Sequence, residues 1–104
     1  MKTLIIDSSN NKQIIVGLKI GNKKHLVKHK VDSKKAQVIL PLIEKILKKH
    51  SFKIEDINSI SVDTGPGSFT GLRIGISIAN VLGFALKIPV NGKNIGELVE
   101  PVYK

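Results

Sequence analysis

The sequence predicts an α/β fold in which two main helices accompany a five-stranded mixed sheet of strand order 3-2-1-4-5. The first observation is a pair of short apolar or β-branched runs before residue 21, separated by turn residues and followed by a tight turn that suits a third strand. The second is a pair of helical apolar patterns later in the chain, each followed by another short apolar run. With 104 residues, 41% of them hydrophobic, the chain is long enough for one compact domain, and it has no cysteine for disulfides or thiolate metal sites.

Three strands open the predicted fold. The run Lys2–Asp7 is rich in Leu and Ile and ends in a cluster of Ser and Asn, which favours a buried strand followed by a turn. Gln13–Ile20 is rich in β-branched residues. The dipeptide Gly21-Asn22 then suits a tight hairpin into a third strand, from Lys23 to about Lys30.

The first helix is predicted to run to about His50, with Asp32 or Ser33 as its N-cap. Pro41 lies inside this pattern and removes one backbone hydrogen bond, which predicts either a kink near Gln37 or a helix start close to it. The apolar residues that recur at helical spacing are Val38, Ile39, Leu42, Ile43, Ile46 and Leu47.

The second half of the chain is predicted to alternate strands with helical segments. A single turn over residues 54–56 precedes a fourth strand, Ser59–Thr64. Ser68 or Thr70 caps a second helix over Thr70–Leu86, and Lys87–Val90 is the fifth strand. A last turn, capped by Asn94, covers residues 96–99.

This order of elements matches a ribonuclease H-like lobe. Hairpins join the first three strands, whereas helical crossovers, which are right-handed between parallel strands, join the later ones. We expect residues 1–104 to form a single domain.

The segment from Gly65 to Gly75, with the sequence GPGSFTGLRIG, leads from the fourth strand into the second helix. A glycine-rich turn at a helix N-terminus can bind an anion. The segment lacks the Gly-Lys-Ser/Thr ending of a P-loop, however, and its glycines do not have the GxGxxG spacing of a dinucleotide-binding turn. The pattern therefore favours a plain turn over a phosphate site.

A stripe of small residues runs along the second helix at intervals of four: Gly71, Gly75, Ala79 and Gly83. Each glycine costs about 0.8–1 kcal/mol of helix propensity relative to alanine, so a close backbone contact must offset the loss. That contact is either with the chain's own sheet or first helix, or with a partner. The rest of the helix is apolar nearly all round, but at about 17 residues, with Arg73 inside, it is too short and too polar to cross a membrane.

Positive charge is concentrated in the first half of the chain. The net charge is +9, and from Lys12 to Lys53 there are twelve lysines and only Asp32 and Glu44 as acids. Such a surface suits a polyanion, which makes a lysine-rich RNA-binding module one alternative function. Biased codon usage is the other explanation, because Arg73 is the only arginine while Ile and Asn are plentiful.

No catalytic constellation can be assembled from the sequence. Asp7, Ser8 and Ser9 follow the first strand, where a vestigial phosphate loop is conceivable, but they lack a glycine that would let backbone approach a phosphate. His25 and His29 share a strand face, opposite to Lys24, Lys28 and Lys30, yet two ligands do not close a zinc site. We therefore expect no catalytic residue, no metal and no cofactor.

The run from Gly65 to Gly75 strongly resembles the signature of the TsaB (YeaZ) family, accessory proteins of bacterial tRNA threonylcarbamoyladenosine synthesis. Segments that resemble this family in the same order are 4–9, 38–43, 55–57 and 88–90, so the resemblance covers about residues 1–100. Family members usually have a second lobe that roughly doubles their length, and many have a histidine near the start of the first long helix, where this chain has Lys34-Lys35-Ala36-Gln37. We therefore expect a first lobe only, as a minimal form or a fragment, and carry no role over for that histidine.

The resemblance implies an actin-like ATPase lobe that has lost catalysis and serves as a scaffold. It implies that the chain binds and activates TsaD, the subunit that transfers threonylcarbamoyl to the adenosine beside the anticodon, and that the ATPase TsaE joins the complex. We also expect a homodimer in isolation, weak or indirect contact with tRNA, and a cytoplasmic location without membrane contact. The implied interface on the two helices consists of Pro41, Leu42, Lys45, Phe69, Gly71, Arg73, Gly75, Ile78, Ala79 and Gly83.

Overall fold

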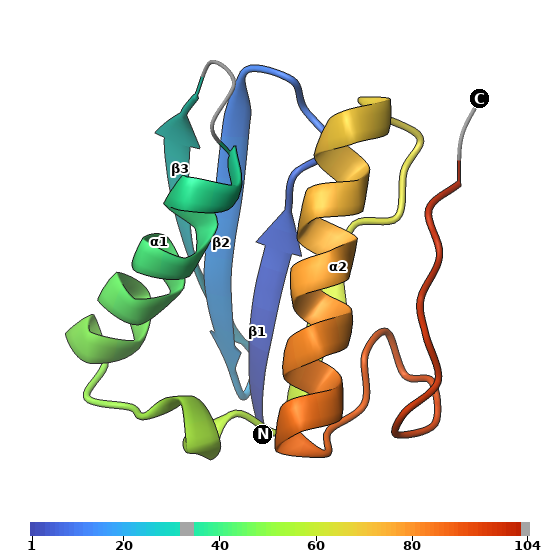
Figure 1. Cartoon of the computed structure of the whole chain (residues 1–104). Helices are drawn as coiled ribbons and strands as arrows, with labels where there is room; N and C mark the ends of the chain where they lie inside the picture. The colour runs from blue at the N-terminus through green and yellow to red at the C-terminus, as the bar shows by residue number, and fades with distance from the viewer. Residues whose placement is uncertain (32–34, 103–104) are drawn as a thin grey trace.

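The structure of the chain, a computed structural model, describes residues 1–31 and 35–102. Its sheet has four strands in the order β3-β2-β1-β4, and both long helices cover the same face of this sheet (Figure 1). The elements in chain order are β1 (Lys2–Asp7), β2 (Gln13–Ile20), β3 (Lys23–Lys30), α1 (Lys35–Lys49), the 3-10 turn η1 (Ile54–Asp56), β4 (Ser59–Val62) and α2 (Phe69–Leu86).

The opening three strands are confirmed. β1 pairs antiparallel with β2, and β2 pairs antiparallel with β3 across the two-residue loop Gly21-Asn22. Gly21 has a φ of 60°, a left-handed conformation that glycine adopts without steric cost. β4 lies parallel to β1 on the other side, and the helical crossover through α1 leads into it from β3.

The fifth strand predicted over Lys87–Val90 is wrong. The described chain reduces it to one parallel bridge, Ile60 to Val90. Pro89 has no N–H to donate to a strand ladder, and Asn91 has a φ of 53°, which turns the chain away from the sheet. The Asn91 side chain replaces the missing strand: its Oδ1 accepts from the Val62 N–H at 2.8 Å, and its Nδ2 donates to the Val62 carbonyl at 2.9 Å.

Replacing Asn91 with glycine is expected to lower the free energy of unfolding by about 1–2 kcal/mol, because both Val62 backbone groups lose a partner. Glycine retains the left-handed backbone, so the loss reports the amide rather than strain. Urea denaturation followed by circular dichroism measures it. Asn11→Gly, in an exposed turn, controls for the added flexibility of the unfolded chain; an equal effect of the two substitutions would contradict this role.

The two long helices begin close to the predicted positions. α1 starts at Lys35, two residues before Gln37, and includes Pro41. The predicted caps Asp32 and Ser33 lie outside the described residues. α2 starts at Phe69, and Ser68 caps it by accepting a hydrogen bond from the Gly71 N–H.

The hydrophobic core lies between the helices and the face of the sheet that they cover. Strand residues alternate, so that one set points toward the helices and the other points away. The fully buried residues of this core that are less than 2% exposed include Leu4, Ile6, Ile14, Val16, Leu18, Ile39, Ile60 and Leu72.

Candidate functional site

The stripe of small residues on α2 packs against the chain's own sheet. Ala79 is fully buried, and Gly71, Gly75 and Gly83 are buried as well. A Cβ atom at Gly75 would overlap the Ser8 hydroxyl and lie 3.2 Å from the Ser8 Cβ, and one at Gly83 would overlap the Val90 side chain. The expectation that these four residues face a partner is therefore corrected: the close backbone contact that offsets their poor helix propensity is internal.

Ser8 explains why a glycine is needed at position 75. The side chain is fully buried, and its hydroxyl donates to the Gly71 carbonyl at 2.6 Å and accepts from the Gly75 N–H at 3.1 Å. In an α-helix these two backbone groups are the partners of one hydrogen bond, so the hydroxyl bridges them from outside the helix. The hydroxyl thereby ties the end of β1 to α2.

The polar groups of the loop after β1 are engaged in hydrogen bonds within the chain. The Asp7 carboxylate accepts from the Ser9 N–H at 2.9 Å and from the Ser9 hydroxyl at 2.6 Å. The Ser9 carbonyl accepts from the Ser68 N–H at 2.8 Å, and a Cβ at Gly67 would lie 2.7 Å from that carbonyl oxygen. The geometry favours a capping role of Asp7 over a phosphate loop made by residues 7–9.

The outward-facing sides of the two helices carry the exposed large apolar residues of the helical layer. Phe84 is 73% exposed and Val81 66% exposed on α2, and Leu40 is 53% exposed on α1. Half-buried Ile74 and Ile78 continue toward Val81 at spacings of four and three, the spacing of a helix-packing seam. We call these five residues the outer helix surface.

The predicted interface residues divide between this layer and the core. Pro41, Lys45 and Arg73 are exposed and Ile78 is half-buried, whereas Leu42 is buried at 9% exposure, together with the four stripe residues. The side chain of Phe69 lies outside what the structure describes. Of the outer helix surface, the sequence prediction included only Ile78 and missed Leu40, Ile74, Val81 and Phe84, although the face of α2 opposite to the glycine stripe could have indicated Phe84.

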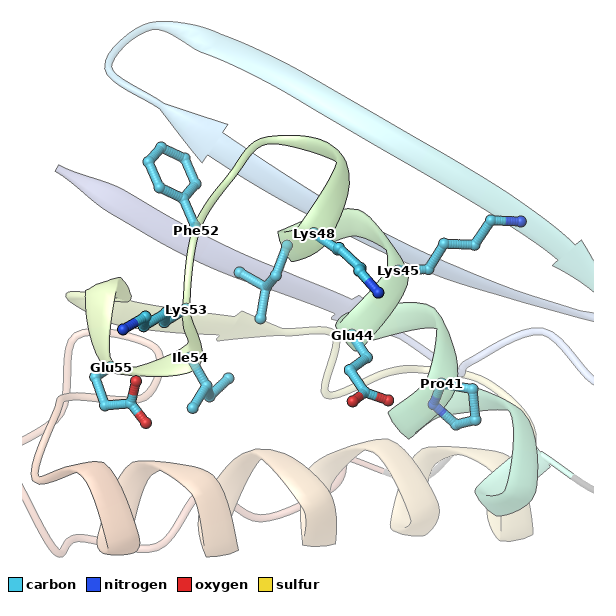
Figure 2. Close-up of a pocket in the computed structure, with 9 residues that line it drawn as sticks. Pro41, Glu44, Lys45, Lys48, Phe52, Lys53, Ile54 and Glu55 are labelled. Atoms are coloured by element: carbon cyan, nitrogen blue, oxygen red, sulfur yellow. The ribbon is translucent and has the colours of Figure 1, made fainter.

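A groove of about 760 Å³ adjoins α1 (Figure 2). Pro41, Glu44 and Lys48 line it from α1, while Phe52 and Ile54 line it from the connector that follows. The Lys2 ammonium lies 5.0 Å from the centre of the Phe52 ring, and this cation–π contact joins the connector to β1. The groove is lined by apolar side chains and by charged side chains of both signs.

The described residues contain no group of three His, Asp or Glu side chains placed to hold a metal ion. The His25 and His50 rings lie 4.6 Å apart between centroids, and His50 Nδ1 is 2.9 Å from the Ile46 carbonyl. None of the described helices is long and apolar enough to cross a membrane.

Comparisons with known proteins agree on tRNA threonylcarbamoyladenosine synthesis, with a family model named for the transferase TsaD and curated relatives named TsaB. A family model described as tRNA N6-adenosine threonylcarbamoyltransferase matches residues 26–95. The tRNA threonylcarbamoyladenosine biosynthesis protein TsaB of Buchnera aphidicola from Schizaphis graminum is 46% identical over 54 residues, which is 52% of this chain and 26% of that protein. TsaB of Escherichia coli K12 is 45% identical over 56 residues, 54% of this chain and 24% of its own length.

The fold comparison agrees. The structure of YeaZ from Pseudomonas aeruginosa superimposes with a TM-score of 0.81 at 28% identity, covering 89% of this chain and 43% of the YeaZ chain. This chain thus spans less than half the length of the relatives it matches.

Proposed function

Because this chain belongs to the TsaB (YeaZ) family of tRNA threonylcarbamoyladenosine biosynthesis proteins, we propose that it is a scaffold subunit that binds and activates a TsaD-like transferase. The transferase carries out the chemistry on the adenosine beside the anticodon of tRNA. The observation that carries the proposal is the outer helix surface, an apolar layer on the helices that the chain's own core leaves uncovered.

The chemistry of this surface suits a protein partner. Phe84 and Val81 lie about one turn apart on α2, so an apolar helix of a partner could cover both. Buried aromatic side chains at the centre of an interface contribute most of the binding free energy, which makes Phe84 the expected anchor. Arg73, also exposed, lies more than two turns toward the N-terminus and can mark the polar rim.

A scaffold role, rather than an enzymatic one, is supported by the loop after β1. Its only carboxylate, Asp7, is engaged by Ser9, and the Ser8 hydroxyl is engaged by α2. A nucleophile needs a free hydroxyl within reach of a base, which neither serine offers here. In this proposal a TsaE-like ATPase joins the assembled complex in the cytoplasm.

The proposal is tested by adding the chain to the TsaD-like subunit of the same organism. We expect the two to co-purify and the transfer of threonylcarbamoyl to tRNA to increase, whereas the chain alone hydrolyses neither ATP nor peptides. Asp7→Ala is the control, because any turnover by the chain that this substitution removes would indicate a catalytic lobe. Failure of the two proteins to associate would contradict the scaffold role.

In the absence of the transferase, the outer helix surface is expected to pair with a second copy of the chain. A symmetric contact would place the Phe84 side chains of two copies near the symmetry axis and remove them from water. Sedimentation equilibrium at high micromolar concentration should then give the mass of a dimer. A monomer at all concentrations would contradict this expectation and show that the outer helix surface does not drive dimerisation.

A further inference from the structure

The face of the sheet that points away from the helices is open to solvent among the described residues, and it carries a cluster of lysines. Both helices lie on the opposite face (Figure 1). Buried Leu18 is paired with His25, and buried Val16 with Val27, so the odd-numbered positions of β3 face the helices. The alternate positions of β2 and β3 form what we call the open face: Gln13, Ile15, Gly17, Lys19, Lys24, Leu26, Lys28 and Lys30.

The strand register brings like charges together on this face. Lys19 lies directly opposite Lys24, and two positive charges in directly opposite positions destabilise a sheet. Lys28 and Lys30 follow on the same strand, at alternate positions. All four are exposed, and in the described part of the chain none of them forms an ion pair.

Acidic residues do not balance this charge. The segment 8–31 contains six lysines and neither Asp nor Glu. Asp7, at the end of β1, is paired directly with Ile15 and lies on the same face, but its carboxylate accepts two hydrogen bonds from Ser9. The fold therefore carries the repulsion within a cluster of like charges, and none of its described contacts pairs these lysines with an acidic residue.

Codon bias explains the abundance of lysine but not its placement. The exposed positions of α2 include Thr70, Ser77, Val81, Phe84 and Ala85, and the helix has no lysine over its eighteen residues. α2 thus carries no lysine, whereas four of the eight residues of the open face are lysines. Two faces with such different chemistry are suited to two different partners.

We propose that the open face binds the phosphate backbone of folded RNA, and specifically of tRNA. Lysine ammonium groups bind phosphates as point charges and gain affinity by releasing counterions. From Lys24 to Lys30 the strand extends about 20 Å, which covers several successive phosphates. None of the residues of this face is aromatic, so stacking on single-stranded bases is not available and binding is independent of base sequence.

The choice of tRNA as the RNA rests on the proposed function, whereas the phosphate site does not. An RNA held on the open face lies on the side of the sheet opposite to the outer helix surface. One lobe can therefore hold the transferase with its helices and the tRNA with its strands at the same time.

The test measures the affinity of the chain for unmodified tRNA by fluorescence anisotropy, at salt concentrations from about 50 to 300 mM, the range over which phosphate contacts weaken steeply. The variant Lys24→Gln, Lys28→Gln, Lys30→Gln is expected to bind about tenfold or more weakly at low salt and to reduce the slope of log K against log salt by about three. The control Lys49→Gln, Lys53→Gln, Lys87→Gln removes the same charge from exposed positions elsewhere and should reduce both quantities far less.

The melting temperature of the open-face variant should equal or exceed that of the wild type, because removing Lys24 relieves its repulsion with Lys19. Its co-purification with the TsaD-like subunit should be unchanged, which separates this inference from the proposed function. Equal losses in the two triple variants would show that only net charge matters and would overturn the site. Binding to vesicles that contain anionic lipid, with none to tRNA, would overturn it as well.

Discussion

Replacing Gly75 with leucine is expected to lower the free energy of unfolding by about 2–4 kcal/mol, and the melting temperature by about 10 °C or more. The new side chain has no room, because a Cβ alone would overlap the Ser8 hydroxyl and lie 3.4 Å from Ile6 Cγ2. Moving Ser8 away also leaves the Gly71 carbonyl without one of its donors. The gain of up to about 1 kcal/mol from removing a mid-helix glycine does not offset these losses.

Thermal denaturation followed by circular dichroism measures this effect. Ser77→Leu, two residues along the same helix but exposed, is the matched control and should change the free energy of unfolding by no more than about 0.5 kcal/mol. Gly75→Ala should be rescued in part by Ser8→Ala, which removes the overlapping hydroxyl, so the double-mutant cycle should give a coupling energy of about 1 kcal/mol or more. A Gly75→Leu chain that melts at the wild-type temperature would mean that α2 does not pack on β1 through this glycine.

The double variant Val81→Glu, Phe84→Glu is expected to keep its fold and to bind the TsaD-like subunit about 30-fold or more weakly. Both side chains are mostly exposed in the free chain, so charges there disturb no core contact. In a complex the same positions would be buried, where an unpaired carboxylate is strongly unfavourable. The affinity is measured by isothermal titration calorimetry.

Ile95→Glu is the control for this experiment, because Ile95 is 60% exposed but lies in the segment after α2, outside the outer helix surface. It should leave the affinity for the TsaD-like subunit within about twofold of the wild type, as substitutions outside an interface usually do. Equal affinities for all three chains would place the contact elsewhere on the molecule.

The strands and helices were predictable because their signals are local. The alternation in Gln13–Ile20, the glycine of the hairpin and the serine before α2 each specify a structure within a few neighbouring residues. The prediction of a fifth strand was wrong because the Asn91 side chain, and not a strand backbone, forms the hydrogen bonds with Val62 of β4. A side-chain amide that replaces a strand leaves no pattern of alternation to detect.

The orientation of α2 could not be predicted, because the helix is apolar nearly all round and periodicity therefore assigns it no single buried face. The deciding contact joins Ser8 to Gly75, residues 67 positions apart. For the same reason, the exposed side of α2 could not be predicted. Helical spacing grouped the four small residues correctly, but only their packing on β1 and Val90 shows that the opposite side of α2 is exposed. The lysines of β3 were assigned to one face because alternation along a strand is local.

The central claim is that the transferase binds the helices and not the sheet, and site-specific photo-crosslinking tests it most directly. A photoreactive amino acid is placed at position 81 on α2 or at position 26 on β3, where the native side chains are 66% and 50% exposed. The chain is then irradiated with the TsaD-like subunit. We expect a covalent adduct from position 81 and none from position 26; an adduct from position 26 alone would contradict the claim.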